Sequence, residues 1–163
     1  MKKIFKRLSP NPTTIKNHKY LSKLKLDNPA LWNFNRKSIR KGVAIGLFCA
    51  FLPIPMQMIL ASLLAIAFAG NILVAITLVW ITNPLTIPLI YYTTYKLGAW
   101  ILGVQVSSNL QFSFESVGGI FNQIWQPLLL GSLLTSVVFS IIGYFLINCI
   151  YYLKLQKRLL NNN

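Results

Sequence analysis

The feature that most constrains this chain is the near absence of charge from residues 42–153. This long stretch contains one cation, Lys96, and one anion, Glu115. A charged side chain at the centre of a bilayer costs about 2.5–3.5 kcal/mol or more, so membrane segments largely exclude such residues. Apolar residues make up 55% of the chain, against roughly 45–50% in soluble domains. The pattern predicts an all-α integral membrane protein.

The two ends of the chain carry nearly all of its charge. Twelve of the 16 lysines and arginines lie in residues 1–41, and the tail adds Lys154, Lys157 and Arg158. Cytoplasmic segments of membrane proteins are rich in Lys and Arg. We therefore divide the chain into a basic cytoplasmic or interfacial head (1–41), a membrane domain (42–153) and a basic cytoplasmic tail (154–163). Both termini are expected in the cytoplasm.

Residues 29–41 have the pattern of an interfacial amphipathic helix. Asp27 or Asn28 can cap its start, and Pro29 suits the first turn. At helical spacing the apolar residues share one side, and these are Leu31, Trp32, Phe34 and Ile39. The other side carries candidate ligands for anionic lipid headgroups, namely Arg36, Lys37, Arg40 and Lys41. The same cations could serve only to orient the protein in the membrane, and the two roles are compatible.

Prolines divide both of the following apolar blocks. Pro53 and Pro55 interrupt residues 42–69, and the sequence Asn83-Pro84-Leu85-Thr86-Ile87-Pro88 interrupts residues 71–103. Proline removes a backbone donor and clashes with the preceding turn, so neither block can be one continuous helix. Both halves of the first block, and the first half of the second, are too short for a core about 30 Å thick.

Broken backbone inside a membrane must be buried in protein or line a wet cavity, because lipid offers no hydrogen bonds. We therefore expect the two breaks to lie together, where polar side chains can bond to the freed carbonyls. The residues of this candidate site are Pro53, Pro55, Gln57, Asn83, Pro84, Thr86 and Pro88. Broken helices of this kind hold solutes or ions in transporters, although they can equally serve only to shape a compact fold.

The last part of the chain predicts two further helices. Residues 104–126 lack Lys and Arg, and from Phe114 onward they suggest an amphipathic helix in the outer interface. Residues 127–153 carry no charge and predict one full transmembrane helix. With both termini inside, the two broken blocks together cross once, so one of them is re-entrant. The sequence leaves open which one.

The spacing Gly42-Val-Ala-Ile-Gly46 allows two helices to approach closely. It could serve packing within the chain or a contact between two copies.

The chemistry needed for catalysis is sparse. The two carboxylates, Asp27 and Glu115, are expected on opposite sides of the membrane, and His18 stands alone in the head. General acid–base catalysis and metal binding both need clustered groups. We therefore expect no enzyme activity, no metal and no cofactor.

The run over residues 29–103 resembles the bacterial inner-membrane family called domain of unknown function twenty-sixty-two. The resemblance is carried by LWNFNRKSIRKGVAIGLFCAFLPIPMQM, by the segment around Asn71 and by WITNPLTIPLIYYTTYKLG. It implies a small multi-pass protein of the bacterial inner membrane with an unassigned role. Some relatives join a similar domain to a glycosyltransferase, which points to work on envelope lipid or glycan.

Two classes of function follow from these observations. The first is a transport-like, lipid-handling or envelope-handling protein that uses the broken helices as its site. The second is a scaffold that transports nothing and holds anionic lipid or a cytoplasmic partner. The expected partners are the bilayer and anionic phospholipids, with a second copy of the chain or an envelope-biosynthesis protein as open alternatives. Nucleic acid is not expected.

Overall fold

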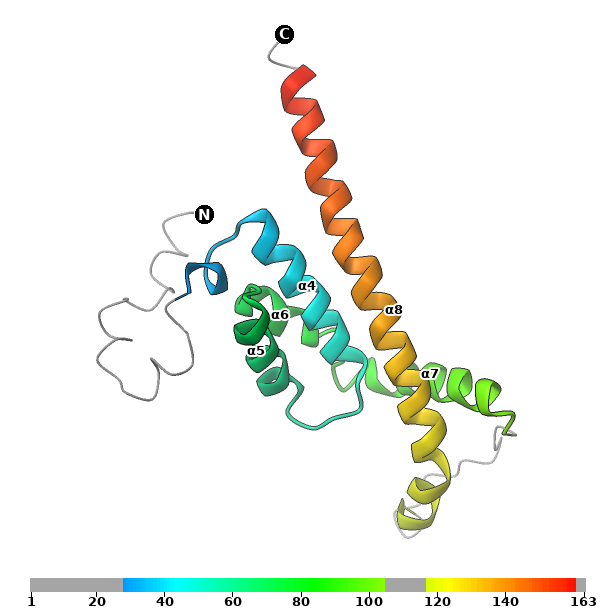
Figure 1. Cartoon of the computed structure of the whole chain (residues 1–163). Helices are drawn as coiled ribbons and strands as arrows, with labels where there is room; N and C mark the ends of the chain where they lie inside the picture. Colours follow the sequence, from blue (N-terminus) through cyan, green and yellow to red (C-terminus); the bar gives the residue numbers. More distant parts are fainter. Residues whose placement is uncertain (1–27, 105–116, 161–163) are drawn as a thin grey trace, which may run out of the picture.

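The computed structural model describes residues 28–104 and 117–160. They form a short 3-10 helix, η1 (Pro29–Leu31), and the α-helices α4 (Arg36–Phe51), α5 (Gln57–Phe68), α6 (Ile72–Val79), α7 (Ile87–Leu102) and α8 (Val117–Leu160). No strand occurs among these residues, which confirms the predicted all-helical class. The shorter helices gather around one part of α8, and the end of α8 nearest the C-terminus extends beyond them (Figure 1).

The helices of both apolar blocks end at the predicted prolines. α4 ends at Phe51, and Leu52 has an extended backbone (φ −77°, ψ 132°), as expected for a residue that precedes proline. α5 begins after Met56, whose backbone is left-handed (φ 62°). In the second block, α6 ends at Val79 and α7 begins at Ile87. Both blocks are therefore interrupted close to the predicted prolines, although the second interruption covers residues 80–86 and Pro88 belongs to α7.

The expectation of a single helix over residues 29–41 is wrong. Asn28 caps η1 as predicted, but the chain leaves the helical conformation after Leu31 and starts again at Arg36. The reason is a second cap: the side chain of Asn35 accepts a hydrogen bond of 2.7 Å from the amide of Ser38. The basic residues thus occupy the first turns of α4, and α4 continues across the predicted boundary at residue 41.

The expectation of a separate amphipathic helix before Pro127 is wrong in the part that is described. Residues 117–126 are the start of α8, which continues through Pro127 without a break. Proline is tolerated inside membrane helices where a neighbouring helix packs against it. Pro127 is buried, and a Cβ added to Gly98 of α7 would overlap its carbonyl. Within α8, Ile124–Lys157 is long and apolar enough to cross a membrane.

α4 runs antiparallel to α8 and also packs against α6. The rings of Phe51 and Phe139 lie 4.6 Å apart, and Val43 and Leu47 contact the α8 position of Gly143. On its other side α4 approaches α6 so closely that a Cβ at Gly42 or Gly46 would overlap carbonyl oxygens of Asn71 and Ala75. The Gly42–Gly46 spacing therefore serves packing within the chain.

The start of α4, the end of α5 and the start of α6 lie together. The ammonium group of Lys41 donates a 2.9 Å hydrogen bond to the carbonyl of Phe68. Asn71 is fully buried, its amide N–H bonds to the carbonyl of Ser38 at 3.0 Å, and its side chain caps α6. α4 and α5 consequently form a hairpin whose two ends meet. The predictions that concern His18, Asp27, Glu115 and residues 105–116 lie outside the described residues.

Candidate functional site

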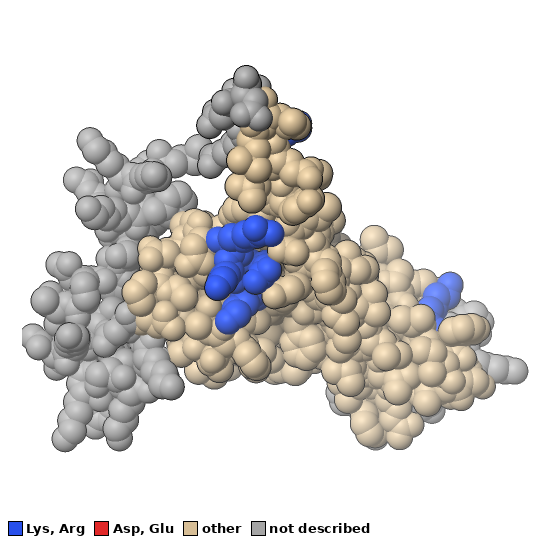
Figure 2. All heavy atoms as spheres, turned by 45° about the horizontal axis from the view of Figure 1, so that its top comes forward, with Lys and Arg blue, Asp and Glu red and all other residues tan. Residues whose placement is uncertain are grey.

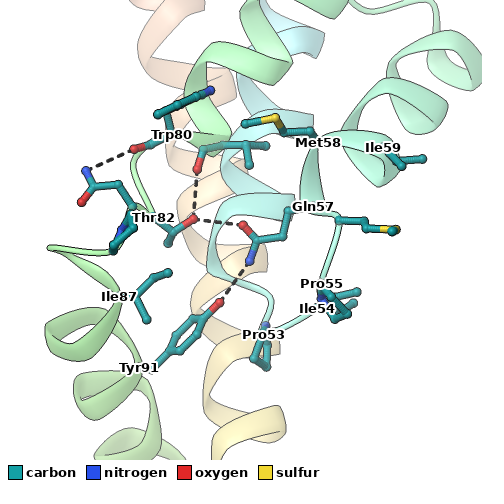
Figure 3. A pocket seen from close by; sticks show the side chains of 14 residues that line it. Pro53, Ile54, Pro55, Gln57, Met58, Ile59, Trp80, Thr82, Ile87 and Tyr91 are labelled. Carbon is teal, nitrogen blue, oxygen red and sulfur yellow. Dashed lines mark hydrogen bonds between the residues drawn. The ribbon is translucent and has the colours of Figure 1, made fainter.

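The two proline breaks lie side by side, as the backbone argument predicts. Gln57, the first residue of α5, reaches from the first break toward the second (Figure 3). Its side-chain oxygen accepts a 3.0 Å hydrogen bond from the hydroxyl of Thr82, in the second break. Its side-chain nitrogen donates a 3.0 Å bond to the hydroxyl of Tyr91 on α7.

The same side chains satisfy a carbonyl that the prolines set free. Leu52 precedes Pro53, and its carbonyl oxygen accepts hydrogen bonds from the Gln57 amide nitrogen and, at 3.3 Å, from the Tyr91 hydroxyl. The hydroxyl of Thr82 also lies 2.9 Å from the carbonyl oxygen of Val79, so its one proton is shared between this oxygen and that of Gln57. Three side chains from three segments thus form one closed polar network around the joined breaks.

A groove of about 700 Å³ lies beside this network. The surface that lines the groove is mainly apolar. The lining residues are Pro53, Ile54, Pro55, Met56, Gln57, Met58, Ile59, Val79, Trp80, Thr82, Asn83, Pro84, Ile87 and Tyr91. Among its polar side chains, Thr82 and Tyr91 are already hydrogen-bonded to Gln57 (Figure 3). The groove therefore offers a guest mainly hydrophobic contact.

Asn83 and Thr86 serve only the second break. The side-chain oxygen of Asn83 accepts hydrogen bonds from the amides of Leu85 and Thr86, at 2.9 and 3.1 Å. The hydroxyl of Thr86 donates to the carbonyl of Ile81 at 2.6 Å. Both residues thus supply partners to backbone groups of their own 80–86 turn, and neither bonds to the first break.

Thr82 and Tyr91 form the bridge instead, and sequence reasoning missed both. Thr82 adjoins the predicted break, and that adjacency is the one signal that could have identified it. Tyr91 lies inside α7, where tyrosines at a membrane surface are common. Pro88 belongs to the first turn of α7, where proline fits without breaking a helix.

The four predicted headgroup residues have different surroundings. Arg36 and Arg40 turn toward α8, where both donate to the same side-chain oxygen of Asn148, at 3.0 and 2.9 Å. The guanidinium of Arg40 also lies 4.9 Å from the ring centroid of Tyr144. Lys41 bonds to Phe68 at the end of α5, and Lys37 is exposed.

The basic residues of α4 form one continuous patch, with no acidic side chain beside it in the described part of the chain (Figure 2). Residues 28–104 and 117–160 contain neither Asp nor Glu. Within these ranges the protein therefore supplies only neutral partners to the arginines, an amide oxygen and an aromatic face. We call Arg36, Lys37, Arg40 and Lys41 the basic patch.

The fold, the groove and the basic patch define a helical protein with a helix able to cross a membrane and with broken helices that meet. The chain belongs to the family described as Uncharacterized protein conserved in bacteria (DUF2062), which matches residues 20–159. This confirms the resemblance seen in the sequence. No curated protein and no solved structure matches the chain significantly.

Proposed function

We propose that the protein is a non-enzymatic, multi-pass protein of the inner membrane that handles lipid, and that the groove receives a hydrocarbon chain. The observation that supports this proposal is the chemistry of the groove. Its walls are mainly apolar, and Thr82 and Tyr91 are both hydrogen-bonded to Gln57. A site for a polar solute or ion needs polar groups free to replace its water shell.

The depth of the groove in a bilayer supports the same proposal. The helical rise along α8 from Gly131, which meets α7, to Asn148, which holds the arginines, is about 26 Å. That length is close to a hydrocarbon core of about 30 Å. Phe51 packs on Phe139, near the middle of this interval, and the first break follows Phe51 directly. The groove would then open at mid-depth, where lipid chains are the available ligands.

We further propose that the α4–α5 hairpin is the re-entrant block. Lys41 bonds to Phe68, so the hairpin enters and leaves on the side of the basic patch. α6 starts on that side as well, because Asn71 bonds to Ser38. α6 and the 80–86 turn then lead toward α7, which lies across α8 (Figure 1). In this arrangement α7 leads from the groove toward the outer interface, and the exposed Lys96 can reach the outer headgroups.

Fluorescence quenching by a brominated fatty acid tests the groove. Trp80 lines the groove and is 63% exposed, whereas Trp100, on α7 and 79% exposed, is not among the lining residues. Two full-length variants, each with one of these tryptophans and Phe at the other three positions, would be titrated in neutral detergent. We expect saturable quenching of Trp80, weakened by Ile87→Phe, and non-saturable quenching of Trp100. Non-saturable quenching at both positions would contradict a chain-binding groove.

The second candidate is a scaffold that transports nothing. It is favoured by the basic patch and by the part of α8 that extends beyond the other helices (Figure 1). That part exposes Leu153, Leu155 and Leu159. A scaffold of this kind would retain a partner protein or anionic lipid, and the groove would show no saturable ligand.

A further inference from the structure

We propose that Arg36 and Arg40, on one turn of α4, form a binding site for a phosphate group at the junction of α4 and α8. This site lies at the opposite end of α4 from the groove, and it does not depend on the groove binding a lipid chain. The proposal singles out two of the four residues of the basic patch and assigns them a ligand chemistry.

The first argument is the convergence of two positive charges. Both guanidinium groups donate to one oxygen of Asn148, at 3.0 and 2.9 Å, so the fold holds like charges next to each other. Like charges repel, and the repulsion is stronger where water is partly excluded. An arrangement of this kind is stabilised when an anion binds between or beside the charges.

The second argument is the large unused donor capacity. A guanidinium has five N–H donors, and one from each arginine bonds to Asn148. The Nε–H of each arginine has no hydrogen-bond partner but is shielded from solvent, so the three remaining terminal N–H groups of each arginine are the donors offered to a phosphate. The planar fork of arginine matches the oxygens of phosphate, and such charge-assisted bonds are stronger than bonds to a neutral amide.

The third argument is the charge balance of the surroundings. The described residues include no carboxylate that could neutralise the arginines, while Lys37 and Lys41 flank them on the same helix. The four cations form one patch on the molecular surface (Figure 2). An anion that completes the site would therefore come from outside the described part of the chain, and its negative charge would complement the whole patch.

The fourth argument is position. Asn148 lies about 9 Å of helical rise before Lys154, within the part of α8 that is long and apolar enough to cross a membrane. In the proposed orientation this level corresponds to the inner headgroup layer. A phosphate there can belong to an anionic phospholipid or can be free in solution, and both share the chemistry that the arginines recognise.

Thermal unfolding of the full-length protein in neutral detergent tests the site. Three probes would be compared: phosphatidylglycerol, diacylglycerol, which lacks the phosphate, and inorganic phosphate. We expect phosphatidylglycerol or inorganic phosphate to raise the Tm, and diacylglycerol to leave it unchanged. Competition by inorganic phosphate against phosphatidylglycerol would show that both occupy one site, whereas a response to one probe alone would identify the source.

The charge-conserving double variant Arg36→Lys with Arg40→Lys separates a built site from diffuse attraction. We expect its apparent affinity to fall by about tenfold or more, the change that corresponds to losing one charge-assisted hydrogen bond. The matched control, Lys154→Gln with Lys157→Gln, removes two charges outside the site and should change the affinity much less. A double arginine variant that binds like the wild type would overturn the proposal.

Asn148→Leu distinguishes a ligand site from a purely structural tie between α4 and α8. If the arginines bind phosphate, this variant frees donors and should keep or strengthen the response to the phosphate probes. A folded Asn148→Leu protein that no longer responds would overturn the proposal. An equal response of the wild type to diacylglycerol and phosphatidylglycerol, with none to inorganic phosphate, would also overturn it.

Discussion

Gln57 is the residue that joins the two halves of the broken-helix region. Its single amide contacts a backbone carbonyl in the first break, a hydroxyl in the second break and a hydroxyl on α7. An amide is suited to this position because it can donate and accept at the same time. One side chain thus supplies hydrogen bonds to both helix breaks, which lowers the free-energy cost of interrupting the helices.

We predict that Gln57→Leu destabilises the protein by about 1–3 kcal/mol, because the substitution leaves Leu52, Thr82 and Tyr91 without their shared partner. Chemical denaturation in neutral detergent measures this change. Ser62→Ala is the control, since the Ser62 hydroxyl bonds only to the carbonyl one turn earlier in its own helix. Equal stabilities for the two variants would show that the network contributes little.

Two asparagines at helix junctions allow a second comparison. We predict that Asn71→Leu destabilises the protein more than Asn83→Leu does, and that each loss is about 1–3 kcal/mol or slightly more. Asn71 is fully buried, caps α6 and donates to the carbonyl of Asn33 at 3.2 Å, whereas Asn83 is only half-buried and bonds within its own turn. Thermal unfolding of both variants gives the order, and the reverse order would contradict this assignment of roles.

The close packing of α7 against α8 depends on two glycines. At the crossing, a Cβ on Gly98 would overlap the carbonyl of Pro127, and a Cβ on Gly131 would overlap the carbonyl of Thr94. The backbones therefore meet directly, as small residues permit in membrane helices. The same contact covers Pro127, which is buried inside the continuous α8 helix.

We predict that Gly131→Ala destabilises the protein by at least about 2 kcal/mol. The overlap is with backbone atoms that cannot rotate away, and it outweighs the gain of about 1 kcal/mol in helix propensity. Gly143→Ala on the same helix is the matched control. The added methyl there meets the flexible side chain of Leu47, so we expect a change within about 1 kcal/mol. Similar losses at both glycines would argue against a close crossing.

The whole molecule places its basic elements at one end. The basic patch on α4 and the Lys154 end of α8 point the same way, and the crossing of α7 with α8 lies toward the opposite end (Figure 1). This polarity agrees with the charge pattern that predicts cytoplasmic termini. If the α4–α5 hairpin is re-entrant, as we propose, the end of α5 is exposed on the same side of the membrane as the basic patch.

We predict that Phe68→Cys and Gln156→Cys react with a membrane-impermeant thiol reagent from the cytoplasmic side, and Val104→Cys from the outer side. The background would carry Cys49→Ala and Cys149→Ser, and Val138→Cys, exposed in the middle of α8, should react from neither side. The reason is that Phe68 lies beside Lys41 at the cationic end of the fold. Reaction of Phe68→Cys only from the outer side would show that α5 crosses the membrane.

Much of the fold follows from local features that the sequence displays. Proline inside a helix removes a donor and clashes with the preceding turn, so a break near Pro53 and another near Pro84 could be expected from the sequence. The uncharged run that ends near Lys154 likewise predicts a helix that is long enough to span a membrane. The errors at residues 29–41 and 117–126 have different sources: a cap by Asn35 started a new helix, and α8 continues through Pro127, where α7 packs against it.

By itself, the sequence determined the helical class, the apolar character of residues 42–153, both helix breaks and the concentration of charge in the head and tail. These properties depend on residues that are close together in the chain, so they can be predicted from the order of the side chains. Only the tertiary structure decided that Gln57 meets Thr82 and Tyr91, and that Arg36 and Arg40 share Asn148. Such contacts join residues far apart in the chain, and which polar groups become partners depends on how the helices pack.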